Sequence, residues 1–135
     1  MSNPKQGMSS IYLAYVLKGE AIPVTESLDR FREFAYIDDV VDAWMRALDD
    51  PATQGRTFNL VTGRSITLRE LLRLILAAAG RYPDNYLGHE VAAHAGGQFR
   101  MRADVSAFMS ATGWALRVSL EHGIRRMTDW ARAKG

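Results

Sequence analysis

The chain has 135 residues, and we predict a single domain, residues 1–135, with one hydrophobic core. Its apolar fraction of 47% and charged fraction of 24% are ordinary for a globular protein, and no run of about eighteen apolar residues predicts a membrane span. With a net charge of only +2 and no dense basic stripe, binding to nucleic acid is not expected. The absence of cysteine excludes disulfides and thiolate metal sites, and favours a reducing, cytoplasmic location.

The first half of the chain predicts helices separated by short extended pieces. Closely spaced apolar residues predict a mostly buried helix over 9–17, and an extended piece follows at 21–24. Residues 34–36 read as a second short strand, after which Asp38 is expected to cap a helix that continues to about Leu48. We expect the apolar stripe of that helix to comprise Val40, Val41, Trp44, Ala47 and Leu48.

The second half begins with residues 57–61, which read as a buried strand. The helix that follows carries the clearest signals in the chain. Thr67 and Glu70 form a capping box, and Gly80 ends the helix. Its buried face is predicted to contain Leu68, Leu71, Leu72, Ile75, Leu76 and Ala79.

Residues 81–98 are rich in turn formers and poorly patterned, and a short helix is predicted over 106–111. Ser119 is expected to cap a last helix, which ends near Ala133. We expect its inner face to contain Leu120, Ile124, Met127 and Trp130, and we interpret Trp44, Trp114 and Trp130 all as core residues. The elements together predict an α/β (α+β) mixture of about five helices with short strands.

Arginines flank an aromatic residue just before the second predicted strand. Arg30 and Arg32 are candidates for binding a phosphate, because the guanidinium group matches phosphate oxygens with two parallel hydrogen bonds. The alternative is that Arg32 is an exposed arginine paired with Glu33 or Asp29, which is a common and weak surface interaction.

Other site chemistry is poorly supported by the sequence. The three histidines lack the spacing of metal ligands, so no metal site is expected. The acidic residues Asp38, Asp39 and Asp42 are interpreted as complementing the dipole at a helix N-terminus. No serine stands in a Gly-x-Ser-x-Gly nucleophile motif.

Five short segments, in order, resemble the NAD-dependent epimerase/dehydratase family, the extended short-chain dehydrogenases that act on nucleotide sugars. The segment at 32–39 reads Arg-Glu-Phe-Ala-Tyr-Ile-Asp-Asp and is similar to the family's Arg-Asp-Phe-x-Tyr-Val-x-Asp signature. The other matching segments are residues 57–63, 104–106, 112–114 and 120–124.

The resemblance implies an N-terminal Rossmann domain that binds NAD(P) in the complete enzyme, and a C-terminal region that closes over the nucleotide sugar. By the motif match, Arg32 would face the pyrophosphate of the substrate, with Arg30 beside it. The family's second phosphate-binding arginine aligns with His94, which carries less positive charge at neutral pH. Ala107 and Val61 are further departures from the pattern, and such drift indicates relaxed demands on substrate binding.

The chemistry of hydride transfer is missing from the sequence. None of the five tyrosines is followed by lysine four positions later, and no glycine-rich turn of the dinucleotide-binding type is present. We therefore expect no catalytic residues and no cofactor site in this chain, which corresponds to the C-terminal, nucleotide-sugar-binding part alone.

Two alternatives remain open. One is a non-enzymatic, oligomeric interaction module derived from such an enzyme, because the family's 57–61 strand extends the Rossmann sheet and its edge would lack a partner here. The other is a subunit of a split enzyme, completed by a separate Rossmann-domain partner.

Overall fold

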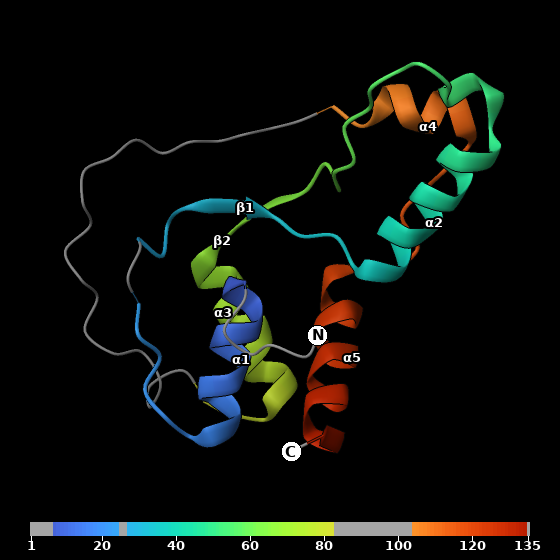
Figure 1. Cartoon of the computed structure of the whole chain (residues 1–135). Helices are drawn as coiled ribbons and strands as arrows, with labels where there is room; N and C mark the ends of the chain where they lie inside the picture. Colours follow the sequence, from blue (N-terminus) through green and yellow to red (C-terminus); the bar gives the residue numbers. More distant parts are fainter. Residues whose placement is uncertain (1–6, 25–26, 83–103, 135) are drawn as a thin grey trace. The chain divides into compact units, whose positions relative to one another are not determined.

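The computed structural model describes residues 7–24, 27–82 and 104–134. These residues form an α/β mixture with five α-helices, one 3-10 helix and a two-stranded sheet (Figure 1). In chain order the elements are α1 (Met8–Lys18), β1 (Phe31–Glu33), α2 (Ile37–Asp49), η1 (Pro51–Thr53), β2 (Ser65–Thr67), α3 (Leu68–Ala79), α4 (Ser106–Thr112) and α5 (Leu120–Lys134).

The chain divides into two compact units. The first unit contains Met1–Phe31, Ile66–Phe99 and Ile124–Gly135, and the second unit contains Arg32–Ser65 and Arg100–Gly123. That residues 1–135 form a single domain stays a prediction. Within the described ranges, no helix combines the length and the apolar character that crossing a membrane requires.

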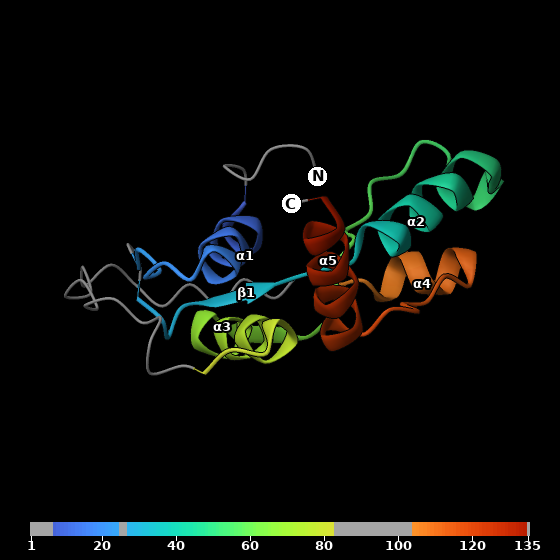
Figure 2. The ribbon, with the colours of Figure 1, turned by 90° about the horizontal axis from the view of Figure 1, so that it is seen from below.

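In the first unit, α1 packs against α3 (Figure 2). The Thr67 hydroxyl accepts a hydrogen bond from the Glu70 N–H at 3.1 Å, which confirms the predicted N-cap of α3. At the other end Gly80 adopts the left-handed conformation expected of a C-terminal glycine. The predicted apolar face of α3 is buried in full, and α1 buries Tyr12, Leu13 and Val16.

The part of α5 that belongs to the first unit differs from the predicted face in two residues. Thr128 is completely buried, and its hydroxyl donates to the Ile124 carbonyl at 2.9 Å. Trp130 is 43% exposed, so its interpretation as a core residue is wrong. The Lys134 ammonium lies 5.4 Å from the centre of its ring instead, a cation–π contact at the surface.

The second unit has a small core of Ala43, Phe108 and Trp114, in which the aromatic rings of Phe108 and Trp114 lie 5.7 Å apart. Four half-buried residues pack against this core: Ala47, Phe58, Leu60 and Val105. The core role predicted for Trp114 is therefore confirmed. In both views α2 and α4 lie side by side (Figures 1 and 2).

The start of helix α2 and the set of its buried residues differ from the prediction. The helix begins at Ile37 with Tyr36 as its N-cap residue, so the predicted cap at Asp38 is wrong. Of the residues predicted for its apolar stripe, Ala47 packs against the core as expected, but Val41, Trp44 and Leu48 are 52%, 69% and 75% exposed. Ala43, which was not predicted, is buried. The cause is packing of the small alanine side chains against the core, which turns the larger apolar residues of α2 outward.

The strands are shorter than expected and lie elsewhere in the chain. The strand predicted at 34–36 forms three residues earlier, as β1. Residues 57–61 form no strand with any other described residue. Phe58 and Leu60 are half-buried while Thr57 and Asn59 are exposed, so the segment keeps the alternation typical of a strand without a neighbouring one.

Candidate functional site

The paired strands β1 and β2 set the geometry around the candidate arginines. The Arg30 carbonyl accepts from the Leu68 N–H at 3.0 Å, and the Leu28 carbonyl accepts from the Arg69 N–H at 2.9 Å. The residue earlier in the first segment, Leu28, bonds to the residue later in the second segment, Arg69. The two segments therefore run antiparallel. Residues directly opposite each other in an antiparallel pair share one face of the ribbon.

One face of this ribbon carries an acid within the second unit. The Ser65 hydroxyl donates to Glu33 Oε1 at 3.2 Å, as expected for residues opposite each other. Glu33 Oε2 is buried and has no hydrogen-bond partner among the described residues. This face therefore holds a sequestered carboxyl group.

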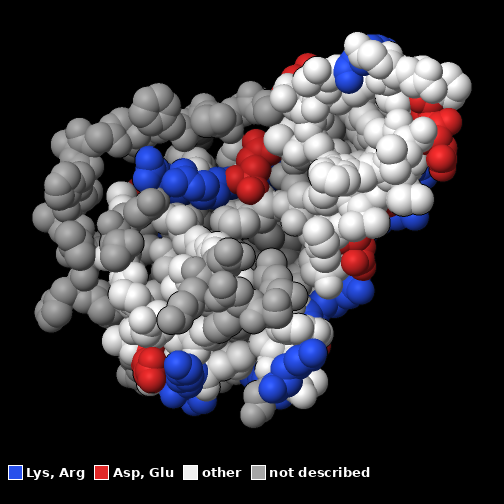
Figure 3. All heavy atoms as spheres, in the orientation of Figure 1, with Lys and Arg blue, Asp and Glu red and all other residues white. Residues whose placement is uncertain are grey.

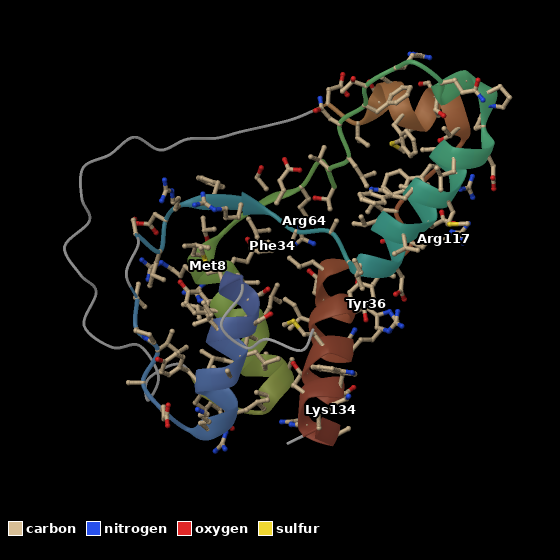
Figure 4. The ribbon with its side chains drawn as sticks, in the orientation of Figure 1. Met8, Phe34, Tyr36, Arg64, Arg117 and Lys134 are labelled. Atoms are coloured by element: carbon tan, nitrogen blue, oxygen red, sulfur yellow. The ribbon has the colours of Figure 1, made fainter. Side chains whose placement is uncertain are left out.

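The opposite face carries cations. Side chains alternate along a strand, so Arg32 projects from the face that Glu33 does not use. Directly opposite Arg32 lies Ile66, which is buried. Arg64 precedes β2 and Phe34 follows β1, so an extension of the same register by one residue would bring Arg64 to the side of Arg32. Figure 4 labels Phe34, Tyr36 and Arg64 along this stretch. Arg32 and Arg64 both belong to the second unit. Two guanidinium groups on one face would be suited to binding a diphosphate.

Arg64 has an acidic partner at the start of α5. Its guanidinium lies 3.0 Å from Glu121 Oε1, and the two side chains are 53% and 38% exposed. The pKa of the Glu121 carboxyl is lowered by a hydrogen bond from its own backbone N–H and by the Arg64 hydrogen bond. Exposed pairs of this kind are weak and exchangeable, so a stronger anion can take the place of Glu121.

The lowered pKa of Glu121 gives the pair a defined pH dependence. Its stabilising effect is complete above the pKa of Glu121 in the unfolded chain and is lost as the pH falls through the lower, folded-state pKa. We expect Glu121→Gln to lower the unfolding midpoint slightly at pH 7 and to match the wild type at strongly acidic pH. Thermal unfolding of both proteins across the acidic range measures this, and a difference that grows on acidification would contradict it.

Asp39, at the end of the 32–39 signature segment, makes buried hydrogen bonds within the second unit. Asp39 is only 3% exposed, and its two carboxylate oxygens accept from the N–H groups of Arg117 and Val118, both at 3.1 Å. The indole N–H of Trp114 donates to the Asp39 carbonyl at 3.2 Å. Asp39 thus fixes the segment between α4 and α5, a role that its interpretation as a helix-dipole acid had missed.

A glycine accommodates the tyrosine of the same segment. An added Cβ at Gly123 would lie 2.8 Å from Cδ2 of Tyr36, closer than real Cβ contacts. The start of α5 therefore packs directly on the ring of Tyr36, the N-cap residue of α2. Together, Asp39 and Gly123 fix the surroundings of the segment that begins at Arg32.

The predicted site residues fall in different parts of the chain. Arg32 lies in β1 of the second unit and is half-buried. Arg30 belongs to the first unit, so it is not assigned to the same site. His94 lies outside the described residues. Arg64 was not predicted, because its contact with Glu121 joins residues far apart in the sequence.

The described residues do not fit a dinucleotide or a metal. A dinucleotide-binding turn needs a glycine-rich loop between a strand and a helix N-terminus. Gly63 has a positive φ and follows 57–61, but it leads into strand β2. Among the described residues, no three acidic or histidine side chains are grouped closely enough to bind a metal.

Comparison with known sequences agrees with the order of the motifs. Residues 2–60 match the profile described as the NAD dependent epimerase/dehydratase family. The UDP-glucose 4-epimerase of Mycolicibacterium smegmatis is 32% identical over 128 residues, which cover 95% of this chain and 40% of that protein. A dTDP-4-dehydro-6-deoxyglucose reductase of Escherichia coli is 28% identical, with 96% of this chain and 40% of that protein covered. The chain thus spans about two fifths of the length of these curated relatives.

Solved structures give the same result for the fold. The UDP-glucose 4-epimerase of Thermotoga maritima, determined with UDP-glucose, superposes with a TM-score of 0.84 at 25% identity, over 98% of this chain and 42% of that one. The UDP-glucose 4-epimerase of Thermus thermophilus, determined with NAD, gives a TM-score of 0.77 at 26% identity, over 98% of this chain and 43% of that one.

Proposed function

Because the chain belongs to the NAD-dependent epimerase/dehydratase family, we propose that it forms the nucleotide-sugar-binding part of such an enzyme. The observation that carries the proposal is that Arg32, the arginine of the family signature, and Arg64 belong to the same unit, where an extension of the β1–β2 register would bring them to one face. The buried Asp39 and its two backbone hydrogen bonds support it, because they hold the signature segment in a fixed conformation.

The guanidinium groups of Arg32 and Arg64 fit the diphosphate group that links the nucleotide to the sugar. Arginine binds phosphate oxygens through two parallel, charge-assisted hydrogen bonds, which are roughly twice as strong as neutral ones. In the proposed complex the diphosphate displaces Glu121 from Arg64 and contacts Arg32 directly. The nucleotide and the sugar then lie on either side of the second unit's arginine face.

Catalysis by the chain alone is not part of the proposal. Hydride transfer needs a bound nicotinamide and, in this family, a Tyr-x-x-x-Lys pair, which the sequence does not contain. We propose that a dinucleotide-binding part, in the same polypeptide or in a separate Rossmann-domain partner, supplies both. A cytoplasmic location is proposed as well, since nucleotide sugars and a cysteine-free sequence both fit a reducing compartment.

Calorimetric titration with UDP-glucose, UDP and free glucose tests the binding proposal. UDP-glucose and UDP are expected to bind and free glucose is not, because the diphosphate provides the contact. Arg32→Ala should weaken UDP-glucose binding by roughly tenfold or more, since a hydrogen bond to a charged group contributes about 1.5–3 kcal/mol.

Arg69→Ala is the matched control, because its guanidinium pairs with Asp29 at 3.3 Å in the first unit. It should leave UDP-glucose binding unchanged. Absence of heat with UDP-glucose at millimolar concentration, or equal weakening by both substitutions, would remove the proposal.

A second candidate function is favoured by the exposed apolar face of α2. Such a face fits an interaction module that assembles with other protein chains.

A further inference from the structure

Arg64 and Glu121 meet at the surface of the second unit, on two stretches of backbone that their neighbours hold in place. On the first stretch, the Thr62 hydroxyl accepts from the Arg64 N–H and donates to the Arg64 carbonyl, both at 3.2 Å. Gly63 between them has a φ of 70°, the left-handed conformation that glycine adopts without strain. This turn therefore fixes the backbone from which the Arg64 side chain extends.

Glu121 extends from the start of α5, which is tied to the signature segment. The Ser119 hydroxyl accepts from the His122 N–H at 3.2 Å and so caps the first turn. The two residues before Ser119 donate their N–H groups to the buried Asp39 carboxylate, and Gly123 packs on the tyrosine ring of the signature segment. The Glu121 side chain therefore also starts from a fixed backbone.

The two side chains form a charged pair between these fixed backbones. The Arg64 guanidinium donates to Glu121 Oε1 at 3.0 Å, and Figure 4 shows Arg64 close to the first turn of α5. Because neither backbone has to be ordered first, forming the pair costs only the freedom of the two side chains. Both side chains stay in contact with solvent, so a dissolved anion can reach the guanidinium group.

We propose that Glu121 is a built-in competitor of the anionic ligand, which holds Arg64 in the free protein and is released when a diphosphate group binds. The inference rests on the proposed function, because it takes the diphosphate of a nucleotide sugar as the displacing group. A diphosphate offers more negative charge and more acceptor oxygens than one carboxylate, so it replaces Glu121 at sufficient concentration. The contact thus lowers the affinity of the site without closing it.

A second acid–arginine pair in the chain provides a matched control. Figure 3 shows basic and acidic side chains next to each other over β1 and β2. In the first unit, Asp29 lies 3.3 Å from the Arg69 guanidinium. Replacing either acid by its amide raises the net charge by one, but only Glu121→Gln removes the competitor of Arg64.

Calorimetric titration with UDP-glucose at pH 7 tests the inference. Glu121→Gln should tighten binding by about two- to fivefold, because an exposed ion pair of ordinary strength no longer has to be broken. In the Arg64→Ala background the same substitution should change nothing, since the group that Glu121 competes for is absent. Asp29→Asn should leave the affinity of the wild type unchanged.

The outcomes separate the inference from the proposed function. If the wild type binds UDP-glucose and Glu121→Gln binds it no more tightly, the competitor is overturned while nucleotide-sugar binding stands. An equal gain in the Arg64→Ala background, or with Asp29→Asn, would mean a general effect of charge and would also overturn it. If none of these proteins binds UDP-glucose, the proposed function and the inference fall together.

Protein stability gives the reciprocal measurement, because a ligand that breaks the pair must cancel its contribution to folding. The difference in unfolding midpoint between the wild type and Glu121→Gln should shrink when UDP-glucose is saturating. A difference of the same size with and without UDP-glucose would show that the pair persists in the complex, against the inference.

Discussion

Asp39→Ala is expected to destabilise the protein by roughly 3–5 kcal/mol, the larger of the two strongest effects. The substitution removes a carboxylate that accepts two backbone hydrogen bonds and leaves the N–H groups of Arg117 and Val118 without that acceptor. Because Asp39 is only 3% exposed, water does not readily replace the lost oxygens. Chemical denaturation with global fitting of the unfolding free energy provides the measurement.

Asp38→Ala is the matched control for this effect. Asp38 occupies the same first turn of α2 but is exposed, so its loss should cost less than about 1 kcal/mol from the helix dipole. Asp39→Asn should fall between the two, because the amide retains one acceptor oxygen. Equal destabilisation by Asp38→Ala and Asp39→Ala would show that both residues act only through the helix dipole.

Gly123→Ala should destabilise the protein by roughly 1–3 kcal/mol, although alanine is the better helix former. The added methyl group would lie 2.8 Å from Cδ2 and 3.4 Å from Cγ of Tyr36, so the ring or the helix must move. Against this, replacing glycine by alanine inside a helix contributes about 1 kcal/mol of stability. Thermal unfolding monitored by circular dichroism measures the net change.

The Tyr36 ring provides its own control through a double-mutant cycle. In the Tyr36→Ala background the obstacle is gone, so Gly123→Ala should become stabilising by about 1 kcal/mol. A destabilising effect of the same size in both backgrounds would mean that the glycine is required for another reason.

Local sequence signals predicted the helices well. The capping residue Thr67, the glycine at position 80 and six apolar residues at helical spacing define α3, and all of them depend on neighbours within one or two turns. Ser119 was likewise predicted as the residue before α5, and its hydroxyl accepts from the His122 N–H at 3.2 Å. Capping and periodicity are local properties, and they can therefore be read directly from a sequence.

Which face of α2 is buried could not be predicted in this way. Periodicity shows which residues share a face, but not whether the chain supplies anything to cover that face. Trp44 and Ala43 are adjacent in sequence, and the core accommodates the alanine. The same reasoning applies to 57–61, whose pattern is that of a strand but which has no neighbour among the described residues.

Of the candidate site, the sequence predicted only the residues that belong to the family signature. Arg32 followed from the motif, whereas Arg64 required an extension of the register of β1 and β2. Asp39 and Gly123 act on residues far away in the sequence, so their roles depend on the fold and have no local signature. The resemblance identified the segments that matter, and the structure shows that Asp39 and Gly123 support the conformation of the first of them.

The most direct test of the nucleotide-sugar site is a ¹H–¹⁵N NMR titration with UDP-glucose that follows the arginine side-chain Nε–H signals. We expect the largest shifts at Arg32 and Arg64, with Arg69 unchanged, because only the first two share the proposed diphosphate-binding face. Saturating UDP-glucose that moves neither signal, or shifts confined to the first unit, would contradict the proposed site.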